Sequence, residues 1–186
     1  MIEDAEEQDL DIPFLSRDLK MGSHKIRLTK SVYIDRSDFR EVDSKDYFRL
    51  APGKTVGLLQ MPYPIKAISF TKDEATGAIN DIKAIFDRRG KKPKTYIQWV
   101  PEGSCTAEVR IHTALFNSDQ PKSAPGGFMD DINPDSETIW PNAMIENGFY
   151  EVRRRAPWPE AEGEKSGSFG PESIRFQAIR VAYFRG

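Results

Sequence analysis

The chain has 186 residues and carries 27 Lys and Arg against 29 Asp and Glu, which gives a formal net charge of -2. Its single cysteine excludes a disulfide scaffold, and the lack of any run of about 18 apolar residues excludes a membrane-spanning helix. The charge balance argues against a histone-like nucleic-acid binder, and the length suits one ordinary domain or two small ones.

The chain reads as a series of short strands punctuated by 13 prolines and 13 glycines. The acidic residues 1–11 are interpreted as a solvated leader. Strands are expected, in chain order, at residues 31–35, 55–59, 65–70, 78–86, 95–100, 107–112 and 175–184. Residues 65–70 and 78–86 are expected to pair as a β-hairpin because a loop containing Gly77 separates them. The polar–apolar alternation over 107–112 predicts that one face of that strand is buried.

Helical signals are weak, and residues 129–132 are the one segment where we expect a short helical turn. Turns are expected at residues 51–54, 125–128 and 133–136. Many short strands at this spacing favour an all-β barrel or sandwich. The chain ends at Gly186 on strand-like residues without a polar tail, which indicates that a longer protein continues there.

No catalytic or metal-binding constellation emerges from the residues. There is no phosphate-binding Gly-rich loop, and no pair of His or Cys has metal-ligand spacing. Cys105 is interpreted as a small structural residue because nothing places either histidine beside it. Two basic clusters, at 88–94 and 153–155, are either phosphate-binding or simply solvated. The cations of the first cluster are Arg88, Arg89, Lys91, Lys92 and Lys94.

A set of ordered motifs spans nearly the whole chain. In order they are MGSHK at 21–25, VYIDRSDFR at 32–40, YFRLAPGK at 47–54, VGL at 56–58, KPKTYIQWV at 92–100, EVR at 108–110, PGGF at 125–128 and the closing residues 176–184. Together these motifs resemble glutaminyl-tRNA synthetases. The VGL and PGGF stretches resemble the eukaryotic branch of that family.

The resemblance implies that the chain is only the C-terminal anticodon-binding region of such a synthetase. In that family the region is all-β and forms two small antiparallel β-barrels with few short helices, a fold shared with a ribosomal protein that binds 5S RNA. We therefore expect a first barrel over residues 1–101 and a second over residues 102–186, which returns to the first and lacks the family's last strand.

The same resemblance separates this chain from the chemistry of the parent enzyme. The nucleotide-binding signatures of class I synthetases are absent, so we expect no catalytic residue, no metal and no cofactor here, and an inactive fragment. ATP would bind elsewhere in the parent glutamine–tRNA ligase. The implied partners are glutamine tRNA and the catalytic domain of the parent chain, without a membrane, in the cytoplasm.

The resemblance also points to Lys45–Arg49 as the segment that reads the third anticodon base. Arg49 is kept, and it is expected to hold guanine O6 and N7. Asp46 stands where bacterial members have glutamine, and it either accepts a guanine N–H or orients Arg49. Two arginines that read the first base in bacterial members fall at Gly57 and Leu59, so that reading is weaker or comes from elsewhere.

Alternatives remain open for several of these cations. For Arg49 the alternative is a salt bridge to Asp43 or Asp46. For Arg36 and Arg40 it is surface ion pairing. Besides Arg49 and Asp46, the tRNA-binding candidates are Lys45, Lys54, Arg36 and Arg40, and the possible phosphate contacts are Arg88, Arg89, Lys91 and Lys92.

Two other functions fit the same fold. One is the matching region of a glutamyl-tRNA synthetase, against which the YIDRSDF sequence argues. The other is a β-barrel RNA- or protein-interaction module without anticodon specificity, which the acidic balance and the absence of arginine at Gly57 and Leu59 favour.

Overall fold

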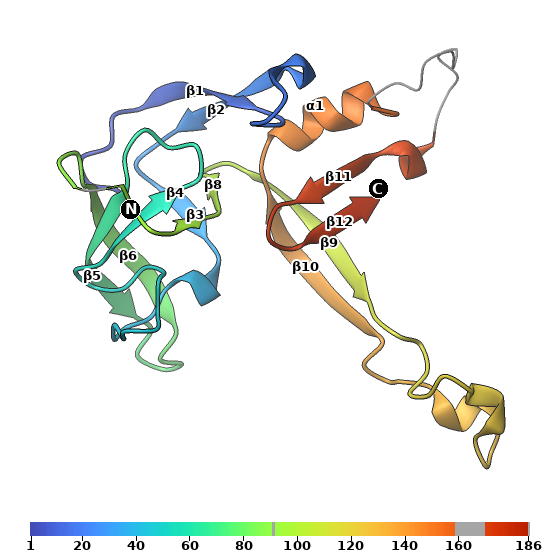
Figure 1. Cartoon of the computed structure of the whole chain (residues 1–186). Helices are drawn as coiled ribbons and strands as arrows, with labels where there is room; N and C mark the ends of the chain where they lie inside the picture. The colour runs from blue at the N-terminus through green and yellow to red at the C-terminus, as the bar shows by residue number, and fades with distance from the viewer. Residues whose placement is uncertain (91, 159–169, 186) are drawn as a thin grey trace. The chain divides into compact units, whose positions relative to one another are not determined.

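The computed structural model describes residues 1–90, 92–158 and 170–185 (Figure 1). It divides into two compact units, one made of residues 1–104 and 146–186 and the other of residues 105–145. Strands dominate, and α1 (Gly148–Arg155) is the only α-helix in the described part, which confirms the predicted all-β class. The predicted division between residues 101 and 102 stays a prediction.

Four small sheets build the first unit. Its strands are β1 (Gln8–Pro13), β2 (Ser23–Leu28), β3 (Val32–Ile34), β4 (Thr55–Leu58), β5 (Ile65–Lys72), β6 (Ile79–Phe86), β7 (Tyr96–Ile97), β8 (Trp99–Pro101), β11 (Arg175–Ala178) and β12 (Ala182–Arg185). The largest sheet has the order β6-β5-β4-β7, in which only the β4–β7 pair is parallel. The pairs β1–β2, β3–β8 and β11–β12 are antiparallel. Among the described residues no sheet closes on itself, so the predicted barrels stay a prediction.

The core of the first unit gathers side chains from the four-stranded sheet and its neighbours. Val56 and Leu58 of β4 are fully buried, as is Ile97 of β7. Successive side chains of a strand point to opposite faces, so Gly57 and Tyr96 lie on the other face of the same pair. Other large aliphatic side chains that are fully buried include Ile2, Leu28 and Leu50. This apolar packing fixes the strands from which the loops of the candidate site emerge.

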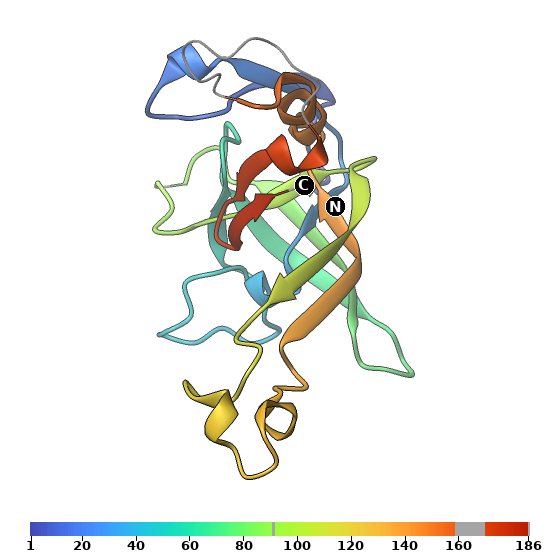
Figure 2. The same cartoon turned by 90° about the vertical axis from the view of Figure 1, so that its right-hand side faces the viewer.

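The second unit is a two-stranded antiparallel ribbon of β9 (Cys105–His112) and β10 (Glu137–Ile145). Figure 2 shows the connecting segment, in yellow, with two short helical turns at Pro121–Ser123 and Phe128–Asp131. The second turn confirms the helical segment expected at 129–132. Residues of β9 alternate between half-buried and exposed, so the predicted alternation is present, but neither face is fully buried.

The acidic residues of the leader are exposed, as expected, but the segment also contains buried residues and a strand. Ile2 is buried in the core, and Ile12 is buried within β1. The acidic residues occupy the outer side of this segment, where Arg27 of β2 contacts Glu7 at 3.0 Å and Asp9 at 3.4 Å. The high density of acidic residues therefore masks the sequence signal of the half-buried strand β1.

Two predicted strands are interrupted. The segment 95–100 breaks at Gln98 into β7 and β8, because β7 pairs with β4 while β8 pairs with β3. The segment 175–184 folds back as the β11–β12 hairpin, in which Arg180 takes a left-handed φ of 68°. Its turn, Ile179–Val181, contains none of the Gly, Pro, Asn or Asp residues that normally announce one.

Helix α1 is not anticipated by the strand pattern. Its signal in the sequence is Glu151 followed, three and four residues later, by Arg154 and Arg155, a spacing that places opposite charges on one helix face. The 3-10 and α-helical segments otherwise remain short, as expected.

Candidate nucleic-acid interface

A 3-10 turn at Arg36–Asp38 places a carboxylate inside the first unit. Asp35 caps the turn, and its carboxylate accepts a hydrogen bond from the backbone N–H of Ser37 at 2.8 Å. Hydrogen bonds from the side chain and backbone of Ser37 hold the pKa of Asp35 below its usual range. Asp38, at the end of the turn, has a side chain that is only 1% exposed. A carboxylate buried this deeply requires cationic partners from the protein.

Backbone pairing brings Arg49 to this carboxylate. The N–H of Leu50 donates to the carbonyl of Asp38 at 3.0 Å, and the N–H of Arg40 donates to the carbonyl of Leu50 at 3.1 Å. Nη1 of Arg49 then lies 3.1 Å from Oδ1 of Asp38. The same nitrogen donates to Oγ of Ser37 at 3.2 Å and to its carbonyl at 3.3 Å. Arg49 is thus anchored at one nitrogen.

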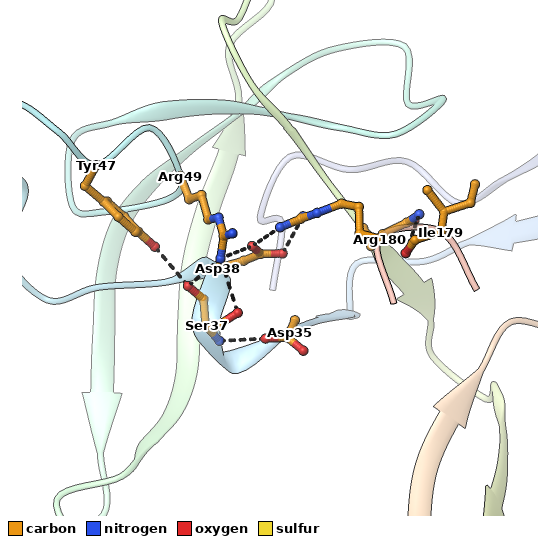
Figure 3. Close-up of polar contacts among 8 residues, drawn as sticks. Asp35, Ser37, Asp38, Tyr47, Arg49, Ile179 and Arg180 are labelled. Carbon is orange, nitrogen blue, oxygen red and sulfur yellow. Dashed lines mark hydrogen bonds and ion pairs between the residues drawn. The ribbon is translucent and has the colours of Figure 1, made fainter. Parts of the chain in front are cut away.

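A second arginine reaches the same carboxylate from the tip of the C-terminal hairpin. Figure 3 shows the guanidinium of Arg180 facing Asp38 opposite Arg49. Nη1 and Nη2 of Arg180 donate to Oδ2 and Oδ1 of Asp38, each at 3.0 Å. This two-bond geometry is the strongest that an arginine and a carboxylate form, and it raises the pKa of Arg180. The Arg180 pair by itself occupies both oxygens of Asp38, which leaves Arg49 as the less constrained cation.

The rest of the Arg49 guanidinium remains open. Its side chain is 39% exposed, and Nε and Nη2 make no hydrogen bond to any described residue. In the described ranges, the only buried side-chain nitrogen or oxygen without a partner is Nδ1 of His24, so Nε and Nη2 of Arg49 reach solvent. Two adjacent N–H groups on a fixed guanidinium form the fork that binds the paired acceptors of guanine.

Phe48, the residue before Arg49, faces an open pocket of about 530 Å³. Its ring is 53% exposed, and Nζ of Lys54 lies 6.0 Å from the ring centroid. The pocket is lined by Asp43, Ser44, Lys45, Phe48, Lys54 and Lys94. An exposed aromatic ring surrounded by three lysines suits an unpaired base with its neighbouring phosphates.

Lys54 is already engaged within this pocket. Its Nζ donates to Oδ1 of Asp43 and to the carbonyl of Tyr47, and it lies 3.5 Å from the carbonyl of Ser44. The hydrogen bond from Lys54 lowers the pKa of Asp43. Lys45, in contrast, is exposed and forms no ion pair with a described residue. Lys54 therefore holds the loop together. Lys45 and Lys94, which is also exposed without an ion pair to a described residue, are the pocket cations open to solvent.

The structure separates the other candidates of this region. Asp46 is exposed and does not contact Arg49, so the carboxylate that orients Arg49 is Asp38 and not Asp46 or Asp43. Arg36 and Arg40 are exposed and form no ion pair with described residues. The guanidinium of Arg40 lies over the ring of Tyr47, 4.5 Å from its centroid.

The cations of the basic loop at 88–94 differ in whether they contact other residues of the protein. Arg88 lies 3.6 Å from the carboxylate of Asp4 and stacks over Tyr63 at 5.1 Å, so it serves packing. Arg89 and Lys92 are exposed and make no ion pair with a described residue. Lys91 lies outside the described residues.

The arginine run at the end of α1 is largely committed to the protein. Arg154 and Arg155 both contact Glu151 at 2.6 Å, and Arg155 also lies over the rings of Phe14 and Trp158. The hydrogen bonds from Arg154 and then Arg155 lower the pKa of Glu151 from 4.5 to about 2. Of the three arginines, the remaining one, Arg153, is exposed without an ion pair among the described residues.

The depressed pKa of Glu151 predicts a pH dependence of α1. A lowered folded-state pKa contributes stability that is fully present above pH 4.5 and is lost as the pH falls toward about 2. An NMR titration of the Glu151 carboxyl carbon is expected to follow that pKa, and Arg154→Gln should raise it. Arg153→Gln is the matched control and should leave it unchanged. A Glu151 titration that is identical in the two variants would contradict the assignment.

Sequence reasoning missed Asp38 and Arg180 as parts of this site, and it left Phe48 open between base stacking and core packing. Asp38 lies 142 positions from Arg180, and no local pattern links residues so distant. The available signal for Phe48 was an aromatic residue set between charged neighbours, a pattern that more often fills a core. Only the fold shows that its ring is exposed.

The described residues offer no other chemistry. No group of three or more metal-ligating side chains gathers within them. Cys105 is half-buried, and its Sγ lies 3.3 Å from the carbonyl of Ile145, in keeping with a structural role. No helix in the described part of the chain has the length and apolar character needed to cross a membrane.

A fork of open N–H groups beside a lysine-lined aromatic pocket, both carried by loops of small sheets, is typical of β domains that bind single-stranded RNA. Models for the anticodon-binding domain of class I tRNA synthetases (E and Q) match residues 1–87 and 96–156. The chain belongs to this family of anticodon-binding domains.

Curated relatives extend the match over almost the whole chain. The glutamine–tRNA ligase protein virJ of Hypocrea virens is 78% identical over 99% of this chain and 28% of its own length. The probable glutamine–tRNA ligase of Schizosaccharomyces pombe is 38% identical over 98% of this chain and 24% of its own length. The Saccharomyces cerevisiae glutamine–tRNA ligase is 37% identical over 98% of this chain and 25% of its own length. The chain therefore spans about a quarter of the length of these relatives.

Proposed function

We propose that this chain recognises the anticodon loop of glutamine tRNA, with Arg49 reading the third anticodon base. The observation that carries the proposal is the state of Arg49: one nitrogen is fixed on buried Asp38 and Ser37, while Nε and Nη2 reach solvent. A guanidinium fixed in this way has lost much of its rotational freedom before RNA arrives, so less entropy is lost on binding.

The chemistry of the third base favours this assignment. Both glutamine anticodons end in guanine, whose O6 and N7 accept two N–H groups of one arginine. The carboxylate of Asp46, three residues before Arg49, is exposed and would accept a guanine N1–H or N2–H. Cytosine at the same position lacks this O6 and N7 pair and presents an N4 amino donor on the corresponding edge.

Contacts to the backbone and to neighbouring bases come from the pocket around Phe48. Lys45 is open for a phosphate, while Lys54 must exchange its bonds to Asp43 and Tyr47 to reach one. Arg36 and Arg40, on the neighbouring turn, and Arg89 and Lys92, on the basic loop, are further phosphate candidates.

The parent protein is proposed to be a cytoplasmic glutamine–tRNA ligase. Its class I catalytic domain would bind ATP and glutamine and would transfer the amino acid to the tRNA that this region selects. The 186-residue chain carries no signature of that catalytic domain and is expected to be inactive alone.

The test is a binding titration with the 186-residue chain. Glutamine tRNA is compared with the same tRNA carrying cytosine in place of the third anticodon guanine, at several salt concentrations. We expect weaker binding of the changed tRNA by about 5- to 150-fold, which corresponds to about 1–3 kcal/mol. Both affinities should fall steeply with salt because phosphates supply a large share of the binding. Equal affinities at all salt concentrations would refute base reading.

The same titration separates the competing functions. A glutamyl-tRNA synthetase region would prefer the cytosine variant, since glutamate anticodons end in cytosine. A protein-interaction module would bind neither tRNA with a salt-dependent affinity. The ion pair between Lys54 and Asp43 is the observation that favours a protein-interaction module, because it removes one cation from the surface proposed to face RNA.

A further inference from the structure

Tyr96 lies flat against a glycine on the outer face of the four-stranded sheet. Gly57 of β4 pairs with Tyr96 of β7 in the parallel register. A Cβ at Gly57 would lie 2.3 Å from Cδ1, 2.5 Å from Cε1 and 2.9 Å from Cγ of the tyrosine ring. These separations are far below van der Waals contact distance, so only glycine at position 57 allows the ring to pack here. The backbone at Gly57 does not have the positive φ that would itself demand glycine.

The ring of Tyr96 remains partly exposed to solvent where it packs on Gly57. The side chain is 39% exposed, although the next residue, Ile97, is completely buried on the core face. Among the described residues none forms a hydrogen bond with the Tyr96 hydroxyl or stacks on its ring. The ring therefore packs on the backbone of β4 at Gly57, and its exposed part is available to a ligand.

Tyr96 also lies close to the basic pocket. Lys94, a lining residue of that pocket, precedes Tyr96 by two positions, so their Cα atoms are at most about 7 Å apart. Phe48 on the pocket wall and Tyr96 on β7 are both exposed aromatic residues, and Lys94 links the pocket to β7 along the chain. Successive aromatic rings along a basic path are the usual means of holding successive unpaired bases.

We propose that Tyr96, packed against Gly57, stacks on an unpaired base of the anticodon loop. The inference rests on the proposed function and adds an affinity-determining residue to it. Stacking on the tyrosine ring takes the place of hydrogen bonding at Gly57, where no side chain is present. It accepts any base, because every base has a π face, and so contributes affinity more than sequence preference.

The experiment uses glutamine-tRNA anticodon stem-loops with 2-aminopurine at one loop position each. Binding of the 186-residue chain is expected to quench the fluorophore at the position that stacks on Tyr96. Tyr96→Leu should abolish this quench and weaken binding of the unlabelled stem-loop by about tenfold. Tyr96→Phe should preserve both. Gly57→Ala should act like Tyr96→Leu, because its Cβ displaces the ring without removing it. Thermal unfolding checks that each variant is folded.

Tyr33→Leu is the matched control, since Tyr33 is another exposed tyrosine of the first unit but lies on β3. It should bind and quench like the unaltered chain. If Tyr96→Leu and Gly57→Ala also bind and quench like the unaltered chain, while Arg49→Ala loses base discrimination, the stacking role is wrong and the proposed function stands. If the unaltered chain neither quenches any position nor discriminates the third base, both are wrong.

Discussion

Replacing Asp38 by asparagine is expected to lower the free energy of unfolding of the chain by about 3 kcal/mol. The substitution removes the one negative charge shared by Arg49 and Arg180 and leaves two guanidinium groups with only a neutral amide between them. Loss of one partner of a buried ion pair costs about 3–5 kcal/mol. The lower end of this energy range applies because both arginines are more than one-third exposed, so water can solvate their guanidinium groups once the carboxylate is lost. Urea unfolding followed by circular dichroism measures the change.

Asp46→Asn supplies the matched control for this prediction. Asp46 is an exposed aspartate of the same region without an ion pair to a described residue, so its loss should change the unfolding free energy by less than about 0.5 kcal/mol. Equal unfolding midpoints for the two variants would show that Asp38 does not tie the C-terminal hairpin to the Arg36–Asp38 turn.

The second large effect concerns recognition. Arg49→Ala is expected to weaken binding of glutamine tRNA by about 5- to 150-fold, or about 1–3 kcal/mol, and to abolish the preference for guanine over cytosine at the third position. The stability of the chain should change far less than in Asp38→Asn, because Asp38 keeps the two hydrogen bonds from Arg180. Binding titrations with both tRNAs provide the measurement.

Arg36→Ala controls for the general loss of a positive charge. Arg36 lies on the turn that holds Asp38, and it is exposed without an ion pair to a described residue. Its removal should therefore weaken binding of both tRNAs by the same factor. A variant that loses affinity but keeps the guanine preference has lost a phosphate contact. If Arg49→Ala behaved in that way, Arg49 would be a phosphate-binding residue and not a base reader.

Much of the fold could be predicted because its strands carry local signals. The β5–β6 hairpin follows from two apolar runs around a loop with Gly77, and β4 follows the turn expected at residues 51–54. The sequence does not reveal where a strand changes partner. The break at Gln98 depends on β4 and β3, which lie far earlier in the chain, and the turn at Arg180 lacks the residues that mark turns.

The candidate site was predicted only in part. The motif that contains Arg49 pointed to the residue that we propose as the base reader, but the sequence offered Asp43 and Asp46 as its acidic partners because they are close in sequence. The structure selects Asp38 instead, since pairing of Leu50 with the Arg36–Asp38 turn brings the two side chains together. The contribution of Arg180 depends on contacts that only the folded chain provides.

The central claim is that Arg49 contacts the third anticodon base, and a double-mutant cycle tests it most directly. The cycle combines Arg49→Ala with the change of the third anticodon guanine to cytosine and measures four dissociation constants under one salt condition. The account predicts a coupling free energy of about 1–3 kcal/mol, because the two changes remove the same pair of hydrogen bonds. A coupling near zero, with each change weakening binding independently, would contradict it.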